Sequence, residues 1–137
     1  MNRSIVYVTG NQSKIDTAQQ YLIKKEITVT QEKVAIDEIQ SENIEEVALD
    51  KAKKAYKALQ KPLLVNDAEW IIPALNGFPG PFMKYMNKWL TAEDFLNLMK
   101  GKVDNTVILR EVYVYSDGKQ SKIFAYDHKA TFLNWIS

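Results

Sequence analysis

Runs of apolar and polar residues divide the first half of the chain into alternating strands and helices. Residues 4–9, rich in β-branched side chains and tyrosine, predict a short buried strand that ends at a Gly-Asn pair. Residues 13–25 repeat apolar positions at helical spacing, and residues 28–39 favour an extended segment. A second amphipathic helix is predicted from residue 44 to about residue 59.

The second half begins with another buried strand at residues 63–65, which residues 70–72 would extend. Two glycines and two prolines in residues 76–81 predict an ordered but irregular loop. Helices are expected at residues 82–89 and again from Thr91.

Two long strands, residues 106–115 and 122–132, end the pattern. Asp117-Gly118 between them suits a type I′ hairpin turn. The order β-α-β-α-β-α-α-β-β predicts an α/β protein with helices packed on a mixed sheet. No repeat or linker interrupts it, so a single domain over residues 1–137 is expected.

Composition narrows the classes of partner. The net charge is +1, without the basic excess typical of proteins that bind nucleic acid polymers, whereas a small phosphorylated ligand needs only a few local cations. The absence of cysteine excludes disulfides, thiolate metal sites and a cysteine nucleophile. No apolar run approaches the ~20 residues of a membrane helix, so a cytoplasmic protein is the default expectation.

The first candidate site is the turn between the first strand and helix, where free backbone N–H groups and the helix dipole favour an anion. Lys14 lies in the first helical turn, where the dipole disfavours a cation unless an anion is bound. A solvated lysine is the alternative, and both remain open here. The candidate residues are Thr9, Gly10, Asn11, Gln12, Ser13 and Lys14.

Lys51 falls on or beside the apolar stripe of the second predicted helix. A lysine there needs a partner or must extend its ammonium to solvent along the apolar surface. The pattern leaves a ligand role and this extended placement both open.

Acidic residues follow the predicted strand at residues 63–65. Asp67 and Glu69 lie just past its end, the usual place for an α/β active site, and could hold Mg²⁺ or act as a general base. Glu38 closes the extended segment and could meet Asp67 across neighbouring strands. A polar loop start is the alternative. His128 is the only histidine, and no Ser-His-Asp arrangement can be argued.

Together these segments resemble the inosine triphosphate pyrophosphatase family. The resemblance lies in residues 8–14, Lys51-Ala52 followed by Ala55, residues 64–67 and the Gly-Pro loop of residues 74–82. It implies a long twisted mixed sheet between two α/β lobes, usually in a homodimer. It also implies Mg²⁺-dependent hydrolysis of deaminated purine nucleoside triphosphates to monophosphate and pyrophosphate.

The resemblance also implies a role for each candidate residue. Lys14 and the backbone of residues 9–13 would bind the triphosphate, and Lys51 would neutralise phosphate charge. Glu38 and Asp67 would serve the metal, with Asp67 as the base for the attacking water.

Two departures from the family pattern leave alternatives open. Asn66 and Ala68 flank Asp67, where the family typically has an acid and a small hydroxyl residue. The chain ends at Trp135-Ile136-Ser137 without the family's Phe-Gly-aromatic-Asp-Pro and Ser-His-Arg motifs, so we expect a C-terminally shortened domain. A divergent pyrophosphatase, a catalytically impaired nucleotide-binding protein and an interaction scaffold all fit this pattern.

Overall fold

A mixed sheet forms the framework of the computed structural model, which describes residues 3–132. Its strands are β1 (Arg3–Val8), β2 (Ile27–Glu32), β3 (Leu63–Ile71), β4 (Pro79–Gly80), β5 (Thr106–Ser116) and β6 (Ser121–Thr131). The strand order is β2-β1-β3-β5-β6, with β4 paired to β3. Strand β1 is parallel to β2 and β3, whereas β4 is antiparallel to β3, so the predicted mixed sheet is confirmed.

The helices follow the predicted pattern. They are α1 (Gln12–Leu22), α2 (Ile44–Leu59), α3 (Met83–Trp89) and α4 (Ala92–Leu98), with short 3₁₀ turns at η1 (Ile23–Lys25) and η2 (Pro73–Leu75). The predicted helix at residues 13–25 is thus an α-helix whose last turn tightens, and Glu26 ends it with a left-handed φ of 59°. Within residues 3–132, none of these helices has the length and apolar character needed to cross a bilayer.

The described chain divides into two compact units. Unit 1 contains residues 3–40, Glu45–Asp67 and Val112–Phe124, and unit 2 contains Ser41–Ile44, Ala68–Glu111 and residues 125–132. Strands β3, β5 and β6 contribute residues to both. The single domain over residues 1–137 stays a prediction, and its last residues, Trp135-Ile136-Ser137, lie outside the described part.

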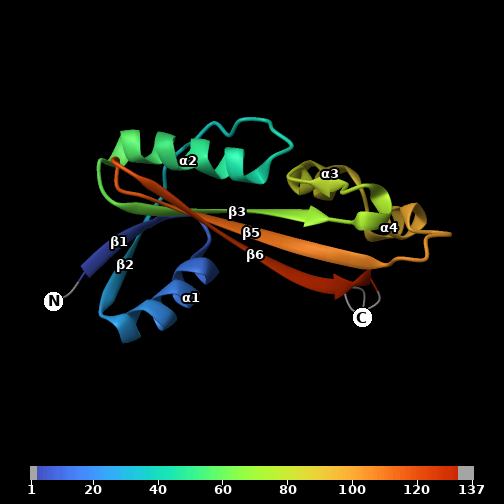
Figure 1. Cartoon of the computed structure of the whole chain (residues 1–137), viewed down its shortest axis with the longest axis horizontal. Helices are drawn as coiled ribbons and strands as arrows, with labels where there is room; N and C mark the ends of the chain where they lie inside the picture. Colours follow the sequence, from blue (N-terminus) through green and yellow to red (C-terminus); the bar gives the residue numbers. More distant parts are fainter. Residues whose placement is uncertain (1–2, 133–137) are drawn as a thin grey trace. The chain divides into compact units, whose positions relative to one another are not determined.

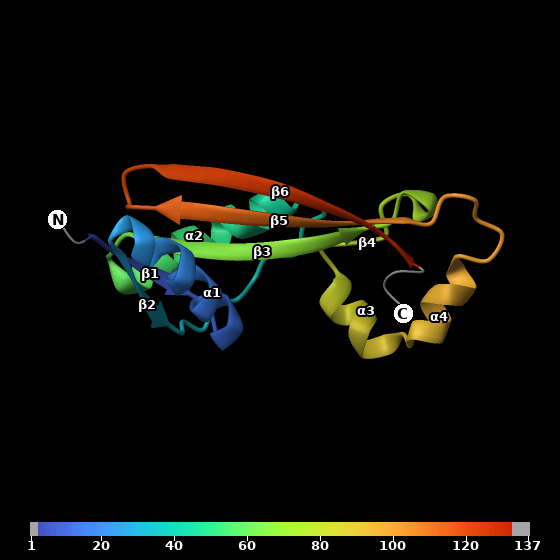
Figure 2. The same cartoon turned by 90° about the horizontal axis from the view of Figure 1, so that it is seen from below.

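In unit 1, α1 and α2 cover opposite faces of the strands (Figure 1, Figure 2). Ile15 of α1 packs with Tyr7 and Val29 of the sheet. Helix α2 buries Ala48, Ala52 and Ala55 completely, together with other apolar residues of the predicted stripe. Three alanines on the buried face let the helix backbone approach its neighbours closely.

Strand β3 does not end at residue 65. It runs through residues 66–69, which the sequence placed after the strand, so that prediction was wrong. The polar side chains are tolerated because they find partners inside the fold: Asn66 Nδ2 donates to the carbonyl of Val112 at 3.3 Å. Pairing with β1 stops at Tyr7 and Leu64, so Asp67 lies beyond the stretch of β3 that β1 covers.

The β5–β6 connection also differs from its prediction. It is a four-residue loop closed by Asp117 N donating to Gln120 O, and Asp117 Oδ1 accepts from the backbone N–H groups of Lys119 and Gln120. A type I′ turn needs two central residues with positive φ, but only Gly118 in this loop has one, at 86°. The aspartate side chain stabilises the longer loop instead.

Unit 2 has its own apolar core. Ile72, Met83, Phe95, Val107 and Phe132 are buried together, with α3 and α4 supplying two of these side chains. Thr91 and Asp94 form a capping box at the start of α4, which satisfies backbone donors that the helix cannot.

We expect Gly118→Ala to destabilise the protein by about 1–2 kcal/mol, because an alanine resists the left-handed backbone and its Cβ would overlap the ring of Tyr56. Chemical denaturation measures this free energy. Adding Tyr56→Leu to Gly118→Ala should restore the part of the lost free energy of unfolding that comes from the overlap with the ring. The part that comes from the left-handed backbone should remain lost. Gly10→Ala is the matched control, since nothing lies within 4 Å of a Cβ there. Equal stability of the Gly118→Ala variant and the original protein would contradict this account of the loop.

Candidate functional site

Lys51 lies at the centre of a charged cluster in unit 1. Its Nζ is 3.6 Å from Glu38 Oε1 and 3.6 Å from Asp67 Oδ2, and it donates to the backbone carbonyl of Asn66 at 3.2 Å. The side chain of Lys51 is 19% exposed, so the lysine has partners and does not simply extend to solvent. The structure therefore brings together three residues that are far apart in the sequence.

Helix α2 positions both sides of this cluster. Lys51 projects from it toward β3, and Lys54, one turn later, donates to the carbonyl of Asp37 at 2.6 Å. Glu38 follows Asp37 in a segment without regular structure, which this hydrogen bond ties to the helix. Helix α2 carries Lys51 and also binds Asp37, the residue before Glu38. The helix therefore keeps Lys51 and Glu38 close together although Glu38 does not lie in a strand.

Asp67 is the more buried of the two acids in the cluster. Its side chain is 17% exposed, and Oδ2 is buried with no hydrogen bond, since 3.6 Å to Lys51 is an ion-pair distance. Burial raises the pKa of Asp67 above its ordinary value, and the nearby Glu38 raises it further, while Lys51 and Lys14 act in the opposite direction. The carboxylate is thus kept more basic than a solvated aspartate.

Asn66 is a site residue whose contribution the sequence analysis missed. It is 5% exposed, and its Oδ1 accepts a hydrogen bond from Lys14 Nζ at 2.5 Å. Lys14 is therefore held toward β3 by a side chain inside the fold. The signal available in the sequence was the position of Asn66 between a buried strand residue and Asp67. The sequence analysis treated Asn66 only as a replacement for the acid that the family typically has there.

The turn between β1 and α1 is more fully hydrogen-bonded than expected. Asn11 caps α1, and its Oδ1 accepts from the backbone N–H groups of Ser13 at 2.9 Å and Lys14 at 3.4 Å. Thr9 Oγ1 accepts from Asn11 N, and Gln12 Nε2 donates to Asp16. A phosphate bound here must displace this cap or use the other N–H groups of the turn, among them that of Gly10.

A cavity of about 410 Å³ opens beside the same turn. Lys33, which directly follows β2, shares its lining with Lys51. The sequence analysis did not select Lys33, because it lay inside the extended segment predicted over residues 28–39, whereas β2 ends at Glu32. The lining residues are Val8, Thr9, Gly10, Lys33, Val34, Ala35, Ile36 and Lys51.

Unit 2 holds a separate polar network. Arg110 donates to both carboxylate oxygens of Asp127, at 2.8 and 3.1 Å, and its Nη1 is 3.5 Å from Glu69. Burial raises the pKa of Glu69, and Arg110 partly offsets this. Glu69 is thus paired with Arg110. The histidine, His128, contacts Glu111 on the strand surface.

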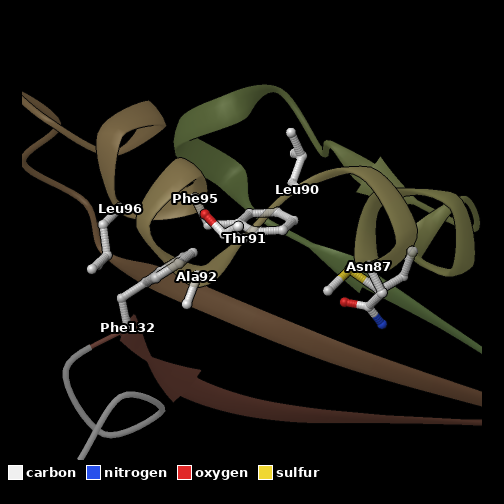
Figure 3. Close-up of a pocket in the computed structure, with 8 residues that line it drawn as sticks. Asn87, Leu90, Thr91, Ala92, Phe95, Leu96 and Phe132 are labelled. Atoms are coloured by element: carbon white, nitrogen blue, oxygen red, sulfur yellow. The ribbon is translucent and has the colours of Figure 1, made fainter.

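Unit 2 also has an apolar cavity of about 360 Å³, lined by residues of α3 and α4 and by Phe132. Figure 3 shows the rings of Phe95 and Phe132 among its walls, with Asn87 and Thr91 as the polar side chains. Among residues 3–132, none of the side chains that line it is ionisable.

The carboxylates of unit 1 suit a hard cation. Among residues 3–132 there is no group of three or more histidines and acids that could enclose a metal. Mg²⁺, however, commonly binds through one or two carboxylates together with waters and substrate phosphates. Asp67 Oδ2, buried and without a hydrogen bond, has lone pairs to offer, and Glu38 lies near the same ammonium. These two residues fit a metal that arrives with its phosphate ligand.

Comparisons with known proteins show which family the chain is similar to. A sequence model of the Ham1 family matches residues 5–130. The chain is 35% identical over 121 residues to the dITP/XTP pyrophosphatase of Methanosarcina acetivorans, which covers 88% of this chain and 66% of that protein. It is 32% identical over 123 residues to the inosine triphosphate pyrophosphatase of Yarrowia lipolytica, covering 90% of this chain and 65% of that one. The chain thus spans just under two thirds of the length of these relatives.

The fold is found in solved structures as well. The Ham1 protein of Staphylococcus aureus superposes with a TM-score of 0.78 at 26% identity, covering 94% of this chain and 71% of that one. A HAM1 protein from Coxiella burnetii gives the same TM-score at 23% identity. The predicted sheet flanked by helices is the fold of these proteins.

The raised pKa of Asp67 predicts how stability depends on pH. In the window from about pH 3.9, the ordinary aspartate value, up to the folded pKa, the native state binds more protons than the unfolded chain. Stability contributed by this group therefore falls as pH rises through that window. The free energy of unfolding of Asp67→Asn should therefore rise relative to that of the original protein as pH increases through this window. Above the folded pKa the difference between the two proteins should stay constant.

Urea denaturation of both proteins at several pH values between 4 and 8, in buffer containing a chelator, measures this difference. Lys53→Gln, at an exposed position of α2, is the control, and its stability difference from the original protein should not change between pH 4 and 8 because a lysine stays charged there. A stability difference between Asp67→Asn and the original protein that shrinks with rising pH would contradict the assignment.

Proposed function

The chain belongs to the Ham1 family, and on that basis we propose that it hydrolyses nucleoside triphosphates with deaminated purine bases to the monophosphate and pyrophosphate. The observation that supports this best is the cluster in which one lysine lies 3.6 Å from two carboxylates. Relatives with more than 30% identity are named as pyrophosphatases acting on dITP and XTP or on inosine triphosphate.

In the proposed reaction the residues of unit 1 work through positioning and charge. Lys51 and Lys14 would offset the negative charge of the triphosphate, with the turn at residues 9–13 around it. Asp67 would take a proton from the attacking water as its oxygen bonds to the α-phosphorus. The bond from that phosphorus to the bridging oxygen breaks, and pyrophosphate leaves with the bonding electrons. A raised pKa suits this role, because a general base works best when its pKa approaches the working pH.

Glu38 and Asp67 are the residues that would hold Mg²⁺. When bound, the ion supplies charge neutralisation at the phosphates and lowers the pKa of coordinated water. Lys51, which neutralises the same two carboxylates in the structure, would then be released to contact phosphate.

A second function is favoured by one observation. Asn66 stands where the resemblance places an acid, and its Oδ1 holds Lys14. With one carboxylate fewer, the site could bind a nucleotide without hydrolysing it. We keep this binding function as the alternative that the experiment must separate.

We further propose that two copies pair in a cytoplasmic homodimer. Strand β6 is the last strand of the order and is exposed along almost its whole length, including Phe124 and Tyr126. An edge strand with such side chains favours association with a second chain. Light scattering at the assay concentration tests this, and a monomer mass would contradict it.

The function is tested by pyrophosphate release from ITP, XTP, dITP, ATP and GTP in the presence of Mg²⁺. We expect release with the deaminated purines, and kcat lowered about 10²–10⁴-fold by Asp67→Asn, because the general base is lost. Lys51→Gln should also lower kcat/KM, whereas Lys57→Gln on the same helix and Glu93→Gln should not.

Hydrolysis by Asp67→Asn at the original rate would overturn the proposed mechanism. Absence of release from every triphosphate, while ITP still raises the Tm, would establish the binding alternative. Absence of both effects would leave neither function standing.

A further inference from the structure

We propose that the cavity at the carboxyl ends of β1 and β2 binds the terminal phosphates of the substrate, and that Lys33 is the cation that holds them. This inference rests on the proposed function for the identity of the anion. It adds a substrate-binding residue and gives the triphosphate a direction in the site.

Strand pairing fixes where Lys33 lies. Val8 is the register partner of Glu32 in the parallel β1–β2 pair, and Thr9 N donates to Glu32 O at 3.2 Å just past the end of β1. Lys33 is the next residue after Glu32. It therefore leaves the sheet beside the turn at Thr9 and Gly10, which carries the candidate phosphate-binding backbone.

The charge of the cavity favours an anion. The eight residues that line it in the described part of the chain include two lysines and no acid. Lys51 is already close to Glu38 and Asp67, so much of its charge is offset. Lys33 has no ion pair or side-chain hydrogen bond within residues 3–132. The cavity is therefore lined by one lysine whose charge is largely offset, Lys51, and by one with an unbalanced positive charge, Lys33.

The size and shape of the wall also suit a phosphate group. The cavity of about 410 Å³ has room for a pyrophosphate, and nothing lies within 4 Å of the position of a Cβ on Gly10. An anion can thus approach the Gly10 backbone as well as the Lys33 ammonium.

This difference in charge between the two lysines gives the triphosphate a direction in the proposed site. The attacked phosphorus lies toward Asp67 and Lys51, and the departing pyrophosphate lies toward Lys33. Since the departing phosphates are anionic before and after their bond breaks, a cation beside them stabilises both the bound substrate and the products, and its loss is expected to act mainly on KM.

The test is calorimetric titration of inorganic pyrophosphate into the full chain and three variants. We expect Lys33→Gln to weaken the Kd roughly two- to fivefold, the effect of one exposed charged contact, and Lys33→Arg to stay near the original value. Lys24→Gln, an exposed lysine on η1, is the matched control and should bind as the original does. In 1 M salt the gap between Lys33→Gln and the original should shrink, because salt screens an exposed contact.

Kinetics give the second readout. Lys33→Gln should raise KM for the triphosphate more than it lowers kcat, and a thermal melt shows that the variant is folded. Pyrophosphate binding that is the same in Lys33→Gln and the original would overturn this inference, as would no binding at millimolar pyrophosphate. Binding that depends on Lys33 without any hydrolysis would uphold the inference while the proposed function fails. Hydrolysis of the triphosphate by the original protein, together with unchanged pyrophosphate binding by Lys33→Gln, would uphold the proposed function and overturn this inference.

Discussion

The shared ion pair of Lys51 with Glu38 and Asp67 is the interaction on which the candidate site depends. Burying a carboxylate is costly unless charge or hydrogen bonds compensate it, and Asp67 Oδ2 has no hydrogen bond. The ammonium 3.6 Å away is its principal compensation. Without Lys51, two acids of like charge would face each other with only Lys14 to offset them, and the raised pKa of Asp67 would rise further.

The fold places these charges through small side chains. Ala48, Ala52 and Ala55 of α2 are fully buried, and this lets the helix lie close enough for Lys51 to reach the backbone of Asn66 on β3. Strand β3 continues past the end of its pairing with β1, so Asp67 is held by a strand and is still open toward Lys51. A rigid strand and a close-packed helix thus determine the distances, while Glu38 is tied in through Lys54 and Asp37.

Much of this arrangement could be predicted from the sequence. Helical spacing placed Lys51 at the edge of an apolar stripe, and the resemblance grouped it with Glu38 and Asp67. What failed were features set by long-range contacts. The polar run at residues 66–69 was placed after the end of the strand because nothing local shows that Val112 and Arg110 satisfy it within a strand. The hairpin turn was mistaken because Asp117 caps a longer loop.

Two site residues were beyond local reasoning. The first is Asn66, which accepts a hydrogen bond from Lys14 across 52 positions of the chain. The local sequence indicated only that an anion could bind near Lys14. Lys33 has significance only because parallel pairing puts it beside Thr9.

The central claim is that Lys51, Glu38 and Asp67 form one electrostatic unit, and the most direct test is the pKa of the Asp67 carboxyl measured by NMR titration in metal-free buffer. We expect a value above that of a solvated aspartate, raised further by Lys51→Met and lowered by Glu38→Gln. A pKa of Asp67 that stays the same in both variants would show that the three side chains do not act together, and would contradict the account.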